Sequence, residues 1–378
     1  MTRLKNPTLR YFNEGSAPPL TPDELLLRDN ISATASMPPE IEAQLAEETI
    51  EVSTGGAQLD PTSLSVRDED QDSVSIALPK NAFVGRPVRT TEFLTASALQ
   101  EFSGAAELPP FRPDWFPNVF HPKHVPPPPR PVMRSREGRQ FYPEALFPPE
   151  NRQAFHPAGY PWHCIGRLFV WRNASAPNPS HSGTAVLVGP RVILTCSHTL
   201  PIGSPSWKCL FVPAYFDGAP VAGAGAASWS SDFRGFTFEA DDQAFDMAVL
   251  RLYDPLGNGL GFFGSKVYHP SWQDQPWWTL VGYAGDIAGA ERPCFEAGIR
   301  VLDDDSDGDF LEIEHRADTS DGNSGGPLFS VWPDGFPYVI GTHSGYEYHS
   351  FPDYEHHNVA AGGKGMNDLI SWARNTWP

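Results

Sequence analysis

Hydrophobic residues after about residue 158 occur in short runs separated by glycine, proline and aspartate. The runs are four to seven residues long and rich in valine, isoleucine, leucine, phenylalanine and tryptophan: IGRLFVW, TAVLVG, RVILT, CLFVPAY, DMAVLRL, WWTLVGY, FLEIEH and YVIGTHS. Runs of this length and composition between turn-forming residues are typical of β-strands. TAVLVGPRVILT predicts a hairpin that turns at Gly189 and Pro190. We therefore expect an antiparallel β-barrel or sandwich.

The end of the chain has a different spacing. Met366, Leu369, Ile370, Ala373 and Trp377 recur at intervals of three and four residues after a glycine-rich stretch. This spacing places the five side chains on one face of a helix. The pattern therefore predicts an all-β domain with a C-terminal helix.

The first 144 residues differ in composition from the rest. Residues 1–108 alternate acidic, Ser/Thr and alanine-rich stretches with few aromatic residues, so they offer too little apolar surface to offset the entropy lost on ordering. We expect this acidic N-terminal region to be mostly disordered. Residues 109–144 are rich in proline and predict a polyproline-type linker, although PPPPRP can also be read as a ligand for an aromatic-lined groove on a partner. Residues 145–378 then form the folded domain.

Charge and hydropathy exclude several classes of partner. Lys and Arg number 27 against 46 Asp and Glu, a formal net charge of −19, and the basic residues are scattered. Nucleic acid and anionic membrane surfaces would be repelled. No run of about 18 apolar residues occurs, so we expect no membrane-spanning helix. The start of the chain, MTRLKNPTLR, is followed by no apolar stretch, so no secretory signal is visible.

The four cysteines, Cys164, Cys196, Cys209 and Cys294, lack the C-x-x-C spacing of a zinc site and the density of a disulfide scaffold. Their even number allows two disulfides in any of three pairings, and buried free thiols are the alternative. The sequence leaves this choice open.

A serine in a glycine-rich stretch is the strongest chemical signal. Ser324 lies in DTSDGNSGGPLF, residues 318–329, between two expected strands. Gly322 and Gly325 allow the backbone to turn sharply around Ser324 and leave its hydroxyl exposed. The N–H groups of Gly322 and Ser324 can then point at one position and stabilise an oxyanion. The alternative is a glycine-rich turn with an ordinary serine.

A nucleophilic serine needs a base, and the base needs a group that orients it. His198 ends the run RVILTCSH and Asp246 opens the run DMAVLRL, so each lies at the end of an expected strand. Single residues at strand ends are usually structural or exposed, but they can also point into a cleft. Together with Ser324, the two residues indicate a catalytic triad.

Three motifs, in this chain order, resemble those of trypsin-like (chymotrypsin-fold) serine endopeptidases: TCSH at 195–198, DMAVL at 246–250 and GNSGGP at 322–327. The resemblance covers about residues 145–378. It implies two six-stranded antiparallel β-barrels with the triad in the cleft between them, and peptide hydrolysis that requires no cofactor and no metal.

The same resemblance assigns roles to further residues. It implies an oxyanion hole formed by the N–H groups of Gly322 and Ser324, and pairing of Ser344 and Gly345 with an extended substrate backbone. Related enzymes are exported, so the resemblance implies an extracellular enzyme although no export signal is visible. We expect a monomer that acts on polypeptide substrates.

Within this superfamily the sequence is most similar to the glutamyl endopeptidases of bacteria and fungi. The matching pieces are FPPENR, YPWHCIGRL, the Asp-Thr pair that ends in Thr319, and the Gly-Thr-His that ends in His343. The resemblance implies that Thr319 and His343 line the primary specificity pocket and bind the glutamate side chain of the substrate, because both can donate hydrogen bonds to a carboxylate. The alternative for His343 is a core histidine. Asp318 and Asp321 depart from this pattern, since they would repel an acidic substrate unless they point away.

The residue before the serine also bears on activation. It is Asn323, which cannot form the ion pair that an aspartate at this position makes with a newly freed amino terminus in digestive trypsin-like enzymes. Glutamyl endopeptidases share this asparagine. Alignment of the segment before Arg152 places the mature terminus near Ala145, so we expect residues 1–144 to form a pro-region that is cut near Glu144.

Two acidic clusters have simpler interpretations. DDDSDGDFLEIE, residues 303–314, has the spacing of a calcium loop, but strand-like residues flank it, so a hairpin is the preferred interpretation. DYEHH, residues 353–357, lacks the i, i+4 pairing of a helical metal site and indicates a polar loop.

The sequence therefore predicts a serine endopeptidase that cuts after glutamate or aspartate through His198, Asp246 and Ser324. The alternative from another class is a protease-fold binding protein that its N-terminal region keeps inactive.

Overall fold

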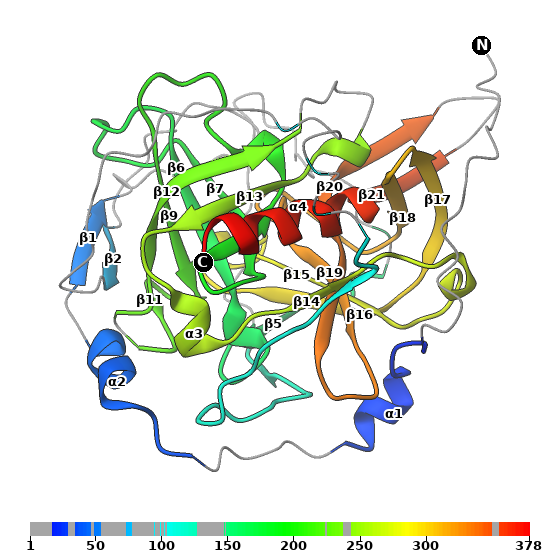
Figure 1. Ribbon diagram of the computed structural model, residues 1–378, viewed down its shortest axis with the longest axis horizontal. Helices are drawn as coiled ribbons and strands as arrows, with labels where there is room; N and C mark the ends of the chain where they lie inside the picture. The colour runs from blue at the N-terminus through cyan, green and yellow to red at the C-terminus, as the bar shows by residue number, and fades with distance from the viewer. Residues whose placement is uncertain are drawn as a thin grey trace.

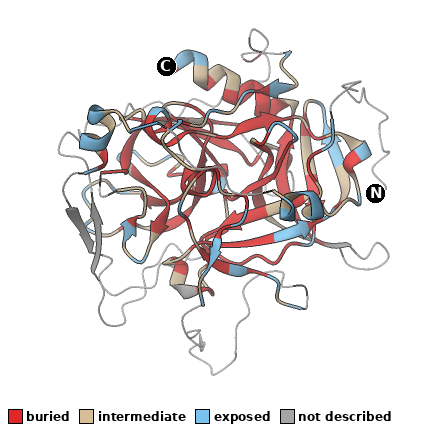
Figure 2. Ribbon diagram, turned by 90° about the horizontal axis from the view of Figure 1, so that it is seen from below, coloured by how far each residue is buried: buried red, intermediate tan, exposed pale blue. Residues whose placement is uncertain are grey.

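β-Strands are the main regular elements of the described structure. The computed structural model describes residues 17–28, 35–46, 49–53, 73–77, 94, 99, 102, 104–126, 147, 149–223, 225–236, 243–349 and 355–378. The prediction of an all-β fold with a C-terminal helix is confirmed (Figure 1). Buried residues concentrate in the strands at the centre of the molecule (Figure 2).

Six antiparallel strands close into a first barrel in the order β12-β13-β8-β7-β6-β9. They are β6 Ile165–Trp171, β7 His181–Leu187, β8 Val192–Thr195, β9 Lys208–Pro213, β12 Ser228–Gly235 and β13 Ala248–Leu252. The predicted hairpin is confirmed, because β7 pairs with β8 across the turn at Gly189 and Pro190.

Both faces of the first barrel are covered. Along β6, Leu168 and Val170 belong to the main core, whereas Phe169 and Trp171 belong to a second apolar cluster on the other face. Successive side chains of a strand point to opposite faces, so a strand packed on both sides needs apolar residues at every position. This explains why its second half, Leu168–Trp171, is a continuous apolar run rather than an alternating one.

The strands predicted for the second barrel belong to an 11-stranded sheet. Part of its path runs β17-β18-β21-β20-β19-β15-β16, and only Arg300 separates β16 from β17 in the sequence. The strands are β15 Trp278–Gly282, β16 Cys294–Ile299, β17 Val301–Asp307, β18 Phe310–His315, β19 Pro327–Val331, β20 Pro337–His349 and β21 Glu355–Gly363. Its core contains Trp272, Trp278 and Trp332, whose ring centroids lie 5.7–6.0 Å apart.

Short strands and helices complete the described structure. The strands are β1 Thr49–Ser53, β2 Ser73–Ala77, β3 Glu107–Leu108, β4 Lys123–His124, β5 Gln153–His156, β10 Tyr215–Phe216, β11 Ala219–Pro220 and β14 Gly264–Lys266. The helices are α1 Pro22–Leu26, α2 Pro39–Leu45, α3 Leu256–Leu260 and α4 Lys364–Thr376. None of the described helices has the length and apolar character needed to span a bilayer.

The C-terminal helix is α4, and it crosses the front of the molecule in Figure 1. The five periodic residues that predicted it, Met366, Leu369, Ile370, Ala373 and Trp377, are all buried. Near its end, Arg374 donates hydrogen bonds to the carbonyls of Val188, Pro109 and Phe263.

Residues 104–126 are attached to the barrels. β3 pairs with β14, and β4 pairs with β5. Between them, the Val119 N–H donates to the Tyr160 carbonyl over 2.7 Å, and Leu108 and Phe120 are buried. The linker prediction for 109–144 did not anticipate these contacts, which cover 109–126; the rest of the predicted linker lies outside the described residues. The domain boundary at residue 145 stays a prediction.

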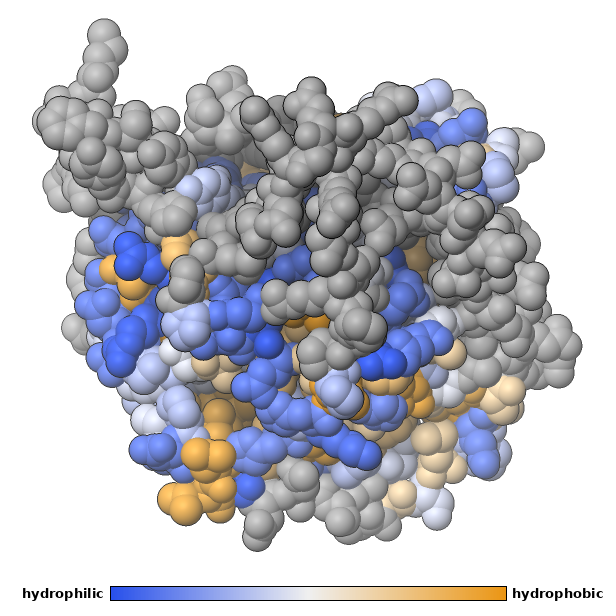
Figure 3. Space-filling view, turned by 180° about the vertical axis from the view of Figure 1, so that it is seen from behind, coloured by the Kyte–Doolittle hydropathy of each residue, from blue (hydrophilic) through white to orange (hydrophobic). Residues whose placement is uncertain are grey.

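Parts of the N-terminal region also contact the barrels. The Leu20 N–H donates to the Val331 carbonyl over 2.8 Å, and the carbonyl of the buried Leu45 at the end of α2 accepts from the Gly225 N–H over 3.0 Å. Leu26 and Leu27 at the end of α1 are exposed, and hydrophobic side chains stand out at that corner of the surface (Figure 3, lower left). The prediction that most of residues 1–108 is disordered falls largely outside the described residues.

Two open questions from the sequence are answered by the strands. All four cysteines are buried free thiols, so the disulfide alternative is not realised. The acidic run at 303–314 forms the hairpin β17–β18, in which Asp307 lies opposite Phe310. The hairpin interpretation is therefore confirmed.

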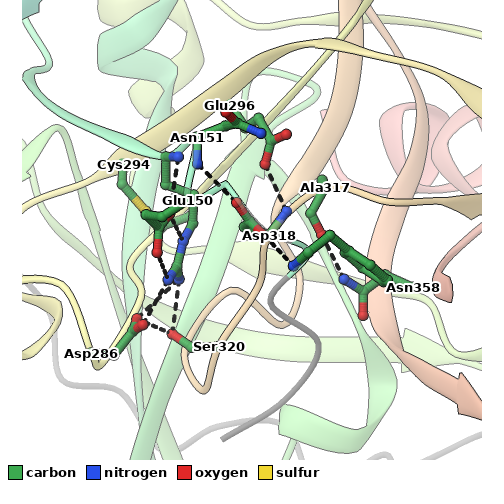
Figure 4. A network of polar contacts seen from close by, with 12 residues as sticks. Glu150, Asn151, Asp286, Cys294, Glu296, Ala317, Asp318, Ser320 and Asn358 are labelled. Atoms are coloured by element: carbon green, nitrogen blue, oxygen red, sulfur yellow. Dashed lines mark hydrogen bonds and ion pairs between the residues drawn. The ribbon is translucent and has the colours of Figure 1, made fainter. Parts of the chain in front are cut away.

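A buried arginine joins the segment before β5 to the loop that carries Ser324. The Arg152 guanidinium binds Glu150 at 2.8 Å and Asp286 at 2.6 Å, and it donates to the Ser320 hydroxyl at 3.2 Å (Figure 4). Because Arg152 is buried, its charge needs these partners. The network holds Ser320 in place, four residues before Ser324.

Two further carboxyl groups belong to this region (Figure 4). Asp318 accepts hydrogen bonds from the N–H groups of Phe147 and Asn151 at 2.6 and 2.9 Å. Glu296 accepts from the Asp318 N–H at 2.6 Å. Burial raises the pKa of Glu296 to about 7, reinforced by the nearby carboxylates of Asp318 and Glu150 and opposed by the Asp318 N–H. Glu296 therefore titrates near neutral pH.

We predict that Glu296→Gln flattens the pH dependence of stability. The folded protein binds the Glu296 proton more tightly than the unfolded chain, so the free energy of unfolding falls as pH rises from about 4.5 to about 7. The loss attributable to Glu296 is at most about 3 kcal/mol, and the glutamine keeps an acceptor for the Asp318 N–H.

Urea unfolding at pH 5 and pH 8 measures this difference. The change between the two pH values should be smaller in Glu296→Gln than in the parent protein, while Asp305→Asn, which alters an exposed carboxyl on β17, should leave it as it is. An equal pH dependence in the parent protein and Glu296→Gln would contradict the assignment.

Candidate functional site

His198 and Asp246 are in direct contact. His198 lies in the single 3₁₀ turn Ser197–Thr199 after β8, and Asp246 lies between the 3₁₀ turn Gln243–Phe245 and β13. The Asp246 carboxylate accepts from His198 Nδ1 at 2.6 Å and from the His198 N–H at 2.9 Å. The Asp246 side chain is 1% exposed and that of His198 is 40% exposed. The carboxylate thus fixes a ring that solvent can reach.

Each group shifts the pKa of the other towards its charged form. Burial alone would raise the pKa of Asp246, but the charge and hydrogen bonds of His198, with the Ser344 hydroxyl, outweigh it and lower the pKa. Burial alone would lower the pKa of His198, but the Cys196 sulfur and the Asp246 carboxylate outweigh it and raise the pKa above its ordinary value. His198 is therefore more basic than a free imidazole, which suits a group that accepts a proton.

Thr184 on β7 joins the serine loop to the first barrel. Its N–H donates to the Ser324 carbonyl at 2.8 Å and its hydroxyl donates to the Gly322 carbonyl at 2.7 Å. The Thr195 hydroxyl, three residues before His198, donates in turn to the Thr184 carbonyl at 2.8 Å. Ser324 is therefore held beside the segment that carries His198.

Two glycines are required by the close packing of this loop. Gly322 has φ +94°, and a Cβ there would lie 2.2 Å from the Tyr283 carbonyl oxygen. Gly325 has φ +84°, and a Cβ there would lie 2.1 Å from the Thr195 hydroxyl. Positive φ and such close contacts exclude other residues at both positions.

The N–H groups of this loop fall into two sets. Those of Asn323, Gly325 and Gly326 donate to carbonyls at 2.7–3.0 Å. Among the residues that the structure describes, the N–H groups of Gly322 and Ser324 have no such acceptor. These are the two groups that the sequence predicts as an oxyanion hole, and they remain free to bind a ligand oxygen.

The structure brings His198 and Asp246 into contact and links the loop of Ser324 to β7 through Thr184, but within the described part of the chain no hydrogen bond joins the Ser324 hydroxyl to His198. Catalytic hydrogen bonds are often long in the absence of substrate. The assignment of the three residues as a working triad stays a prediction.

Thr319 and His343 are both buried beside the serine loop. The Gly325 N–H donates to the His343 carbonyl and the His343 N–H donates to the Gly326 carbonyl, each at 2.8 Å. The Thr319 hydroxyl and His343 Nδ1 are buried and have no hydrogen-bond partner among the residues that the structure describes. Burial, together with the charge of His198, lowers the pKa of His343 to about 4, so its ring is neutral at pH 7.

Ser344 and Gly345 lie where β20 bulges, because the register with β21 shifts between His343 and Gly345. The Ser344 hydroxyl donates to the Asp246 carboxylate at 2.6 Å. The sequence analysis assigned Ser344 only to the substrate backbone, and this contact with Asp246 was missed. Gly345 pairs with Val359 of β21, and its pairing with a substrate stays a prediction.

The sequence analysis also missed His315, whose ring centroid lies 5.8 Å from that of His343. Burial, reinforced by His343 and His357, lowers the pKa of His315 well below its ordinary value. Pairing of β18 with β21 and of β21 with β20 brings these histidines together. No local motif marks them, and only the strand order could have found them.

One group of side chains has the composition of a metal site in the part of the chain that the structure describes. It consists of Cys196, His198 and Asp246, whose ligand atoms all lie within 4.8 Å of one another. It therefore shares two residues with the predicted triad.

Comparisons with known proteins find similarity over the part of the chain that holds this site. Residues 183–333 match a family model described as a trypsin-like peptidase domain. Similar solved structures include a Glu endopeptidase in complex with MPD, at 17% identity and TM-score 0.47, which covers 61% of this chain and 100% of that chain. A protease, Anisep, from Arthrobacter nicotinovorans has 18% identity, TM-score 0.43, and coverage of 59% and 99%. Human heparin binding protein has 13% identity, TM-score 0.40, and coverage of 55% and 91%. No curated protein matches the sequence.

The matched residues begin in β7 and end just after β19, so they include His198, Asp246 and the loop that carries Ser324. They also include Thr184, which joins that loop to the first barrel. Residues 183–333 are therefore similar to a trypsin-like peptidase domain.

Proposed function

We propose that this protein is a serine endopeptidase whose reaction is carried out by Ser324, His198 and Asp246. The observation that carries the proposal is the buried Asp246 carboxylate, which fixes His198 Nδ1 at 2.6 Å beside a serine loop with two free N–H groups. A buried acid, an exposed imidazole and a serine beside unpaired backbone donors are the parts that acyl transfer needs.

In this mechanism Ser324 Oγ attacks the carbonyl carbon of the substrate while His198 Nε2 takes its proton. Asp246 holds the imidazole in the tautomer with its proton on Nδ1 and stabilises the imidazolium that forms. The N–H groups of Gly322 and Ser324 receive the negative charge that develops on the carbonyl oxygen, a contribution of about 3 kcal/mol for each donor. His198 then returns the proton to the leaving amine, and water releases the acyl group by the same steps.

We predict that Ser324→Ala lowers the rate of peptide hydrolysis by a factor of about 10⁴ or more. Mass spectrometry of the products of a peptide library measures this loss. A fluorophosphonate probe should label the parent protein and not the variant. Ser320→Ala, which alters a nearby hydroxyl bound to the Arg152 network, is the matched control and should still be labelled.

Labelling of Ser324→Ala, or turnover by it, would refute the proposal. A folded parent protein that neither reacts with the probe nor cuts any peptide would favour the inactive binding protein instead. The present contacts do not favour that alternative, because His198 and Asp246 keep the hydrogen bond that catalysis requires.

We also propose that substrates are cut after glutamate, and after aspartate less efficiently. The Thr319 hydroxyl and His343 Nδ1 support this specificity, since both are buried polar atoms without a partner in the described part of the chain, and a substrate carboxylate would satisfy them. Asp318 does not oppose it, because the N–H groups of Phe147 and Asn151 bind its carboxylate. A bound carboxylate would raise the pKa of His343 from about 4 and favour uptake of a proton by the ring.

We predict that His343→Ala lowers kcat/KM for a peptide with glutamate before the cleaved bond by about 10- to 150-fold, as expected for loss of a hydrogen bond to a charged group. The matched peptide with glutamine should change much less. Thr342→Val is the control, because Thr342 precedes His343 on the same strand and its side chain points to the opposite face. Equal losses for both peptides would contradict the pocket assignment.

We further propose that residues 1–144 form a pro-region that is cut near Glu144. The expected cut lies outside the described residues. The contacts of residues 104–126 decide whether the two pieces separate after the cut, because β3 stays paired with β14 and β4 stays paired with β5. A cut after residue 126 therefore leaves two chains that stay together.

We predict that protein cut near Glu144 gives two pieces on a denaturing gel but elutes as one species in size-exclusion chromatography. Residues 104–126 hold the pieces through backbone hydrogen bonds and the buried side chains of Leu108 and Phe120. The same sample in concentrated urea should separate into two species. Loss of the N-terminal piece under native conditions would contradict the prediction.

A further inference from the structure

Cys196 lies against the imidazole of His198. Its Sγ is 3.7 Å from His198 Nε2, the ring nitrogen that faces away from Asp246. The two residues are two positions apart, and the turn of the chain from β8 into the 3₁₀ helix Ser197–Thr199 brings their side chains together. The mechanism proposed above gives Cys196 no role.

The separation of these two atoms suits a metal ion. Zinc binds thiolate sulfur at about 2.3 Å and imidazole nitrogen at about 2.0–2.1 Å in tetrahedral geometry, so sulfur and nitrogen ligands of one ion lie about 3.6 Å apart. The observed 3.7 Å is close to that value. An ion between the two atoms would need little movement of either side chain.

Asp246 already makes the hydrogen bond to His198 that a metal-binding histidine needs. Metal-binding histidines usually donate their other ring N–H to a carboxylate, which fixes the tautomer and makes the free nitrogen a better ligand. His198 Nδ1 makes this contact with Asp246 at 2.6 Å, and the Ser344 hydroxyl binds the same carboxylate. The arrangement that prepares Nε2 to accept a proton therefore also prepares it to bind a metal.

The two side chains lie at the boundary between solvent and the interior. The His198 side chain is 40% exposed, whereas Cys196 is fully buried, so the ring gives access from solvent and the thiol lies in the interior. Water can complete the coordination on the exposed side. Binding displaces the thiol proton, so a soft divalent cation that favours thiolate is the appropriate class.

We propose that Cys196 and His198 form a site for Zn²⁺ whose occupancy inhibits the enzyme. A bound ion occupies the Nε2 lone pair, so His198 cannot accept the proton of Ser324 Oγ. Binding itself is independent of the proposed protease function, whereas the inhibition rests on it.

The binding test uses Ser324→Ala, which cannot digest itself, with Co²⁺ as a spectroscopic substitute for Zn²⁺. We expect a thiolate-to-cobalt charge-transfer band in the near ultraviolet that Zn²⁺ displaces. The band should be lost when Cys196→Ala is added and retained when Cys209→Ala is added, because Cys209 is another buried free thiol of the first barrel. Cys196→Ser replaces Cys196→Ala if the alanine variant does not fold.

The activity test uses the parent protein freed of metal with a chelator. Added Zn²⁺ should lower peptide hydrolysis by at least about tenfold, as expected when a general base is blocked, and chelator should restore it. In Cys196→Ala added Zn²⁺ should inhibit much less, so the ratio of the activity without Zn²⁺ to the activity with Zn²⁺ should fall towards one. A charge-transfer band that never forms, or that survives the loss of Cys196, would overturn the site even if peptide hydrolysis is confirmed.

Discussion

The arrangement of the candidate site depends on one buried carboxylate. Asp246 is almost completely removed from solvent, and burial of an unpaired charge would cost several kcal/mol. Three donors offset this cost: the N–H and Nδ1 of His198, and the Ser344 hydroxyl. His198 follows β8 in the first barrel and Ser344 lies on β20 of the large sheet. The donors to Asp246 therefore come from both sheets, so folding and assembly of the site are linked.

A second constraint acts on the serine loop. Thr184 fixes its backbone from the first barrel. Arg152, in the segment before β5, donates to the Ser320 hydroxyl and binds Asp286, which also accepts a hydrogen bond from Ser320. The loop is therefore held at both ends while the N–H groups of Gly322 and Ser324 remain unused among the described residues. A rigid frame around unsatisfied donors is the arrangement that preorganised electrostatic stabilisation requires.

Local sequence predicted those features that depend on local interactions. The apolar runs gave the strands of the first barrel, the turn at Gly189 and Pro190 gave its hairpin, and the helical spacing after residue 365 gave α4. Contacts over long distances in sequence left no such pattern: Arg152 meets Asp286, and His315 meets His343, only because of the strand order. Residues 109–126 were predicted to be part of a linker because the segment is rich in proline, yet they contact the strands through backbone hydrogen bonds and buried side chains such as Phe120.

The pairing of β3 with β14 and of β4 with β5 has a consequence for the sheet itself. β4 ends the path of the large sheet, and β3 covers β14. An uncovered edge strand offers unpaired N–H and C=O groups to other chains and promotes aggregation. A shortened chain that began at residue 145 would expose one edge of β5 and one edge of β14. Residues 104–126 therefore protect these edges from pairing with a second copy of the chain.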